Sequence, residues 1–191
     1  MKEKEGLTPS SFKTFYVSKE NSSCPLIPEI MKIGKKIEEK PFFEKKEDII
    51  ISSRYGQRII SNIVGNNFEE IKKEDFIEIV DYNPVTKALL AIGKKDPRME
   101  TPIHWTILHA KKEINIIVQI NIKDISKKIL KNMEKMKKPK VEEVLEISKK
   151  ILKKLRNQNI ITIEDHGLII VGKTFSEIEN KIKKIENMVE P

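Results

Sequence analysis

The sequence has few cysteines, few aromatic residues and no long apolar run. Cys24 is the only cysteine among 191 residues, so an internal disulfide is excluded and a reducing compartment is expected. No apolar stretch approaches the ~20 residues that a membrane-spanning helix needs. The first residues, MKEKEGLTPSS, lack the apolar core of a signal peptide. We therefore expect a cytoplasmic protein without a membrane partner.

Charged residues, by contrast, are abundant. They make up 35% of the chain, beside 38% apolar residues, which is typical of a globular protein of one domain. Isoleucine, lysine and glutamate dominate, a bias reported for proteins of hyperthermophiles, although AT-rich coding gives the same bias. The net charge of +8 raises nucleic-acid binding as a role. However, lysines alternate with glutamates along predicted helices, as on a solvated face, and we do not expect nucleic acid as the main partner.

Apolar periodicity predicts an α/β domain over residues 27–191, preceded by a polar arm over residues 1–26. In the arm, Phe12, Phe15 and Tyr16 could dock on the domain or on a neighbouring subunit. Helices are predicted at about 28–40, 101–112, 124–136, 141–155 and 175–189, and strands at about 49–51, 58–63, 76–80, 88–92, 115–122, 160–163 and 168–171. This order fits a single central β-sheet covered by helices.

The stretch from residue 98 to residue 121 organises the rest of the chain. Thr101-Pro102 predicts the start of a helix, which places Glu100 at the helix N-terminus, where the dipole favours a carboxylate. In the strand that follows, side chains alternate. One face carries Asn115, Ile117, Gln119 and Asn121, and the other carries Ile114, Ile116, Val118, Ile120 and Ile122. The apolar face is expected to pack, and the amide-bearing face needs hydrogen-bond partners, water or a ligand.

Several motifs in the same order resemble the class II aldolase/adducin family. They are Glu100-Thr101-Pro102, His104-Trp105 and the following strand, Ser52-Ser53-Arg54-Tyr55-Gly56, the hairpin over residues 75–93, and the closing segment IITIEDHGLIIVGKT over residues 160–174. The resemblance covers residues 28–189. It implies the α/β fold of that family, and it implies a homotetramer with each active site near a subunit boundary.

The resemblance also implies a site in which three histidines hold zinc and a glutamate moves the proton. By position the glutamate is Glu100 and the third histidine is His166. The family's His-x-His pair is replaced by Gln119 and Asn121, whose neutral amides are poor zinc ligands. His104 matches a family position that packs structurally, so His166 is the only retained metal ligand.

The family's phosphate pocket is altered as well. The small and amide residues that supply donors to a phosphate are replaced by apolar ones, and Arg98 is the residue that could bring a charge in their place. The segment from Gly167 to Thr174 satisfies G-x-x-x-x-G-K-[ST], but its β-branched middle residues favour a strand over a phosphate-binding loop. Thr174 and Glu177 instead predict a capping box.

Two functions stay open at this point. The first is a degenerate family member without zinc-dependent aldol chemistry, which acts as a small-molecule-binding or assembly protein and needs no cofactor. The second is a metal-dependent aldolase or epimerase acting on a sugar phosphate through a rebuilt site, with zinc or another divalent metal. In the second, Glu100 is the acid/base and His166 a ligand or acid. In the first, Gln119 and Asn121 bind a small polyol or carbonyl compound, or satisfy each other and Glu100 as an inert cluster.

Overall fold

The computed structural model describes residues 12–43, 46–122, 135–136, 144–163 and 167–189. In these residues, nine strands form one mixed sheet in the order β1-β5-β4-β3-β2-β6-β9-β8-β7. The strands are β1 Lys13–Ser18, β2 Lys46–Tyr55, β3 Arg58–Asn62, β4 Phe76–Asn83, β5 Ala88–Ile92, β6 Ile116–Ile122, β7 Lys135–Met136, β8 Ile160–Ile163 and β9 Gly167–Gly172. The predicted α/β fold with a single central sheet is confirmed.

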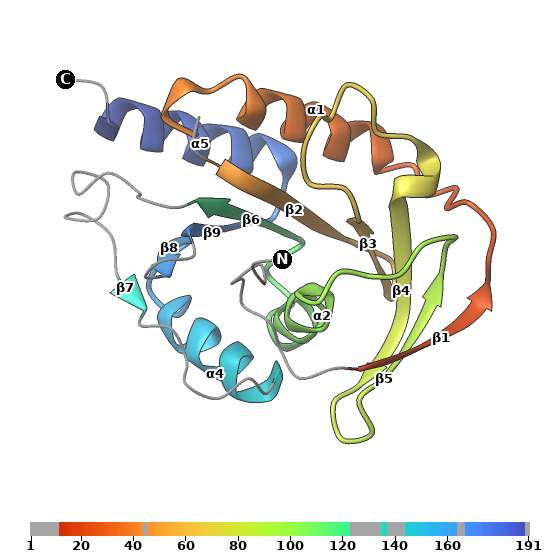
Figure 1. The fold of residues 1–191 in the computed structure, drawn as a ribbon. Helices are drawn as coiled ribbons and strands as arrows, with labels where there is room; N and C mark the ends of the chain where they lie inside the picture. Colours follow the sequence, from red (N-terminus) through yellow and green to blue (C-terminus); the bar gives the residue numbers. More distant parts are fainter. Residues whose placement is uncertain (1–11, 44–45, 123–134, 137–143, 164–166, 190–191) are drawn as a thin grey trace, which may run out of the picture.

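Helices cover both faces of the sheet (Figure 1). Helices α1 (Ile27–Glu38) and α5 (Phe175–Val189) lie on one face, and α2 (Thr101–Ala110) and α4 (Val144–Lys154) lie on the other. Short 3-10 turns stand at Pro41–Phe43 and Lys73–Asp75. No helix of the described segments is long and apolar enough to cross a membrane.

Isoleucine supplies most of the core on both faces. The cluster beneath α1 and α5 includes Ile33 of α1, Ile120 of β6 and Ile182 of α5, and the cluster beneath α2 and α4 includes Ile107 and Ile151. These positions recur every three or four residues in the helices and every second residue in the strands, so each element presents one apolar face to the sheet or its cover. Burial of these faces is what holds the layers together.

Strand β6 lies in the middle of the sheet, between β2 and β9. Its alternation is as the sequence predicts, with one exception. Ile114 precedes the strand and packs in the cluster beneath α2 and α4, whereas Ile116, Val118 and Ile120 pack in the cluster beneath α1 and α5. The strand alternation begins only where the extended pairing begins, at Ile116.

Strand β1 is an element that the sequence analysis did not predict. Residues 13–18, inside the predicted polar arm, pair in parallel with β5. Phe12 and Tyr16 point into the cluster beneath α2 and α4, and the Tyr16 hydroxyl donates to Asp96 at 2.5 Å. This pairing joins segments about 75 residues apart, so the partner of β1 cannot be found from the local sequence.

Two other predictions meet the structure only in part. The helix expected at 124–136 lies outside the described residues except for its last two, and these two form β7 beside β8. At the start of α5, the Glu177 amide donates to the Thr174 hydroxyl oxygen at 3.2 Å. The Glu177 carboxylate accepts from the amide of Lys173, one residue earlier than a capping box requires.

Candidate functional site

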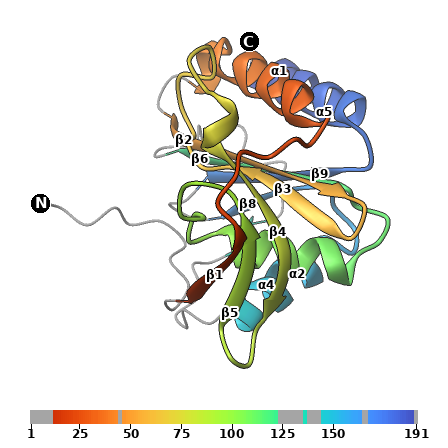
Figure 2. The same cartoon turned by 90° about the vertical axis from the view of Figure 1, so that its right-hand side faces the viewer.

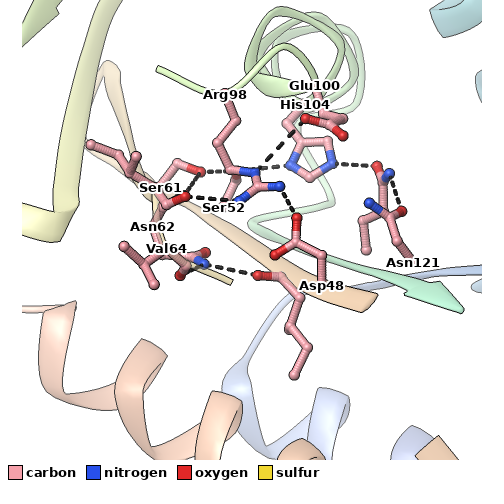
Figure 3. Close-up of polar contacts among 12 residues, drawn as sticks. Asp48, Ser52, Ser61, Asn62, Val64, Arg98, Glu100, His104 and Asn121 are labelled. Carbon is pink, nitrogen blue, oxygen red and sulfur yellow. Dashed lines mark hydrogen bonds and ion pairs between the residues drawn. The ribbon is translucent and has the colours of Figure 1, made fainter. Parts of the chain in front are cut away.

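Three of the predicted site residues, Arg98, Glu100 and Asn121, lie where α2 begins and on the polar face of β6 (Figure 3). Helix α2 starts at Thr101, with proline in its first turn and Glu100 at the N-cap. The Glu100 side chain makes no capping hydrogen bond. It is 6% exposed, and its carboxylate lies 3.8 Å from the Nε of Arg98. Glu100 is therefore a buried carboxylate held beside an arginine, and not a capping group.

His104, one turn into α2, is the centre of a buried hydrogen-bond network. Its Nε2 lies 3.1 Å from the amide oxygen of Gln119, and its Nδ1 lies 2.8 Å from the hydroxyl oxygen of Ser52. The network continues to Ser61, whose hydroxyl oxygen is 2.9 Å from that of Ser52. At its other end, Gln119 donates to the side-chain oxygen of Asn121 at 2.8 Å. Both ring nitrogens of His104 are thus occupied by protein groups.

Burial sets the protonation state of His104, and its hydrogen bonds set the tautomer. Complete burial lowers the pKa of His104 to about 4, although the hydrogen bond to Gln119 opposes that change. The imidazole is therefore neutral at neutral pH. Since the Gln119 amide donates to Asn121, its oxygen must accept from Nε2–H of His104. Nδ1 then lies, without a hydrogen, 2.8 Å from the Ser52 hydroxyl oxygen.

A hydroxyl beside an imidazole is also the arrangement that activates a serine nucleophile. Burial decides against that reading here. Ser52 is 1% exposed and His104 is fully buried, so a substrate cannot reach either side chain. This part of the network is a structural element closed to substrate, and it satisfies polar groups that would otherwise lack partners in the core.

Arg98 is occupied as well (Figure 3). Its guanidinium donates to the carbonyl oxygen of Ile63 at 2.8 Å, pairs with the carboxylate of Asp48, and faces Glu100. Burial lowers the pKa of Arg98, and the nearby charge of Glu100 works in the opposite direction. One cation between two carboxylates carries no spare positive charge for a phosphate.

The loop that would approach a phosphate is tied to the protein's own backbone. The side-chain nitrogen of Asn62 donates to the backbone carbonyl oxygens of Ile49 and Val64. Its side-chain oxygen accepts from the backbone N–H of Ile51. A Cβ at Gly65 would collide with the Asp48 carboxylate. Glycine at this position thus serves internal packing around Asp48.

Arg54, from the Ser-x-Arg-x-Gly motif, also has a structural role. Its guanidinium donates to the carbonyl oxygens of Leu108 and Ile114, and its Nε donates to the side chain of Asn115 at 3.2 Å. These contacts join the C-terminal end of α2 to the start of β6. Gly56 follows with a φ of +60°, a conformation that favours glycine in the tight β2–β3 turn.

The donor set does not fit the zinc site that the family resemblance implies. At the positions of the histidine pair, Gln119 and Asn121 bond to each other, and Gln119 also bonds to His104. Amide oxygens beside one imidazole are weak zinc ligands. Within the described ranges, no group of three histidine, cysteine, aspartate or glutamate side chains is placed to hold a metal. His166 lies outside the described residues.

His109 belongs to an aromatic group away from the network. Its ring stacks on Trp105 at 3.8 Å between centroids, its Nδ1 donates to the Trp105 carbonyl oxygen, and Tyr82 meets Trp105 edge to face. His104 and His109 therefore point to different surroundings, as their spacing of five residues predicts.

With this fold and site, the chain can be compared with known proteins. No family model matches the sequence, and no curated protein matches it. Solved structures do match. An L-fuculose 1-phosphate aldolase is 17% identical, with 90% of this chain and 91% of that one covered and a TM-score of 0.60. YgbL, a putative aldolase/epimerase/decarboxylase from Klebsiella pneumoniae, is 12% identical over 85% and 86%, with a TM-score of 0.65.

A third match is the N-terminal class II aldolase domain of a conserved protein from Thermoplasma acidophilum. It is 14% identical, it covers 91% of this chain and 97% of its own, and its TM-score is 0.60. The chain therefore has the class II aldolase fold, as the ordered motifs predict. At these identities the likeness concerns the fold alone.

The sequence singles out Glu100, Gln119, Asn121 and Arg98, and the structure places Arg98 beside Glu100 at the start of α2 and Gln119 beside Asn121 on the polar face of β6. Sequence reasoning missed the role of His104, which it took as a packing residue. A signal was present in the sequence, because His104 stands one turn after Glu100 and the strand that follows carries amides that need hydrogen-bond partners.

Proposed function

We propose that this chain is a class II aldolase-fold protein without zinc-dependent aldol chemistry, acting as a small-molecule-binding or assembly protein. One observation carries the proposal. Gln119 and Asn121, at the positions of the family's histidine pair, are bonded to each other and, through Gln119, to a neutral buried His104. Removal of these bonds to admit a metal would leave buried polar groups without partners, at roughly 1–3 kcal/mol each.

The same site bears on the ligand. Asp48 and Glu100 outnumber Arg98 where these three side chains meet, and the local excess of negative charge disfavours a sugar phosphate. A neutral polyol or carbonyl compound meets no such repulsion. Asn121 is only half-buried, so its amide is the part of the network that such a molecule can reach.

The proposal includes no resident cofactor. It includes a homo-oligomer, for which the family resemblance suggests a tetramer. If a metal site were rebuilt from other residues, Glu100 and His166 would be the groups to examine, and the activity would be that of an aldolase or epimerase. Glu100 beside Arg98 is a buried carboxylate of the kind that such chemistry uses.

Metal content of untagged protein tests the proposal. The chain is dialysed against zinc, manganese or cobalt, then against metal-free buffer, and analysed for bound elements. We expect well under one metal per chain. A matched control is the double variant Gln119→His with Asn121→His, which restores the ligand types of the family and should retain more zinc than the wild type.

About one tightly held metal per wild-type chain would contradict the proposal. The aldolase alternative would then be tested by turnover on sugar phosphates with the variants Glu100→Gln and His166→Ala. Loss of turnover in both variants, with metal lost only in His166→Ala, would assign acid/base and ligand roles to the two residues.

A further inference from the structure

Three charged side chains meet at the start of α2, on the face of the sheet opposite α1 and α5 (Figure 2). Arg98 pairs closely with Asp48, whereas its Nε lies 3.8 Å from the Glu100 carboxylate, beyond hydrogen-bond distance. That Nε–H is buried and has no hydrogen-bond partner among the described residues. The positive charge of Arg98 is therefore directed to Asp48, and the group of three keeps one net negative charge, on the side of Glu100.

Glu100 has acceptor capacity that the described protein groups do not use. A carboxylate can accept about four hydrogen bonds, and a buried one is normally paired or bonded. Glu100 is 6% exposed, makes no capping bond, and accepts no hydrogen bond from the residues that the structure describes. The neighbouring Thr101 hydroxyl is also buried without a partner there. The start of α2 thus leaves a buried carboxylate in need of donors.

The network around His104 connects Glu100 to a second contact point. Glu100 and His104 stand one turn apart, about 5–6 Å between Cβ atoms, and His104 is joined through Gln119 to Asn121 (Figure 3). Asn121 uses its side-chain oxygen for Gln119, so its half-buried NH2 group is a donor for a ligand. The carboxylate and this amide are on the order of 10 Å apart, a span that a hexose-sized molecule covers with a hydrogen bond at each end.

We propose that this site binds a small polyhydroxylated molecule that carries a primary amino group. At pH 7 such an amine is protonated, as lysine is, with a pKa of about 10.4. Its three N–H donors fill acceptors of Glu100, and its charge cancels the net charge of the site. A hydroxyl oxygen of the same molecule accepts from the Asn121 amide. The inference rests on the proposed function, since it narrows the small-molecule ligand of that proposal from neutral compounds to aminated ones.

Charge selects an amine over other ligands of the same size. A neutral polyol donates hydroxyl groups to Glu100 but leaves its charge without a counterion in a buried site. A phosphate or carboxylate adds negative charge beside Asp48 and Glu100. A divalent metal needs more ligands than two carboxylates, one of which Arg98 already pairs, and the described ranges contain no group of three such side chains.

Isothermal titration calorimetry of the untagged full chain tests the inference with two matched probes. They are 1-amino-1-deoxysorbitol and sorbitol, which differ by an ammonium group in place of a hydroxyl. At pH 7 and low salt we expect the amine to bind at least about tenfold more tightly than sorbitol. Added salt should reduce this preference, because part of it is electrostatic.

Two variants assign the preference to a residue. Glu100→Gln keeps the size of the side chain and removes its charge, so it should abolish the preference for the amine. Glu113→Gln is the matched control, because it makes the same change just after the other end of α2, on a side chain that is 67% exposed, and it should leave the preference unchanged. Thermal unfolding checks that both variants keep the fold, and the two probes on the wild type decide the matter if a variant does not.

Equal affinity for the two probes, or no binding of the amine up to about 50 mM, would overturn the inference. A preference that survives in Glu100→Gln, or one that Glu113→Gln abolishes as well, would also overturn it. Sorbitol bound as tightly as the amine would still agree with the proposed function. Tightly held metal, measured in the separate metal assay, would instead overturn the proposed function itself.

Discussion

The two faces of β6 are stabilised in different ways. On one face, Ile116, Val118 and Ile120 pack beneath α1 and α5, where the favourable term is apolar area removed from water. On the other face, Gln119 and Asn121 belong to the network around His104, where each group needs a partner of the right kind in the right place. The same seven residues thus serve an apolar layer and a polar layer.

The two faces therefore differ in how well they tolerate substitution. An apolar face accepts other side chains of similar volume at little cost. A buried polar network does not, because one missing partner leaves another group unsatisfied. The polar face is also the face where the family resemblance expects metal ligands. Its closure around His104 is the observation on which we base the proposal of a protein without zinc-dependent aldol chemistry.

The largest effect is expected on the apolar face. Ile120→Ala removes a fully buried side chain and should lower the free energy of unfolding by about 3 kcal/mol, in the range of buried isoleucine truncations. Urea denaturation measures it. Val85→Ala, at an exposed turn, is the control and should change stability by less than about 0.5 kcal/mol. A loss below 1 kcal/mol at Ile120, by the same assay, would mean that this face is loosely packed.

A second effect is expected from pH on the polar face. The unfolded chain protonates His104 near pH 6.5, and the folded chain does so only near its pKa of about 4. Between these values the unfolded state binds more protons, so stability falls as pH falls, by about 2 kcal/mol from pH 7 to pH 5. Denaturation midpoints at several pH values measure it.

The variant His104→Asn separates this contribution from those of other titrating groups. It cannot titrate in this range, so its stability should depend less on pH between 7 and 5 than that of the wild type. Equal pH dependence in the two proteins would show that His104 is not a buried neutral group in solution.

The smallest effect is expected at the open end of the network. Asn121 is half-buried, so after Asn121→Ala the Gln119 amide can donate to water, and the loss should stay below about 1 kcal/mol. Gln119→Ala is the matched comparison, because it leaves Nε2–H of the buried His104 without its partner and should cost more. If urea denaturation showed a larger loss of stability for Asn121→Ala than for Gln119→Ala, Asn121 would be the sealed end of the network.

Local signals predicted much of this molecule. Thr101-Pro102 marks the start of α2, because proline suits a first helical turn, and the alternation of isoleucine with amides marks β6 and its two faces. The motif from Gly167 to Thr174 contains strand β9, Gly167–Gly172, as its β-branched residues predict. These features depend on neighbours in the sequence, so they can be derived without the fold.

Features that depend on distant segments could not be derived this way. Exposed and half-buried side chains alternate along the edge strand β1. Its partner β5, however, begins only at residue 88. The role of His104 depends on Ser52 in β2 and Gln119 in β6, which are brought together only by the sheet order. In the sequence, Arg98 is a residue that could bring a charge to a phosphate, and only the tertiary structure shows that Asp48 and Glu100 lie beside it.

Nitrogen NMR of the histidine side chains, from pH 7 to pH 5, tests the central claim most directly. The claim is that His104 is a buried neutral imidazole that donates from Nε2 to Gln119. We predict one histidine that stays neutral, protonated at Nε2, across this range, and that is absent from the spectrum of His104→Asn. A His104 signal that titrates near pH 6.5, or that carries its proton on Nδ1, would contradict the account and reopen the site to metal and substrate.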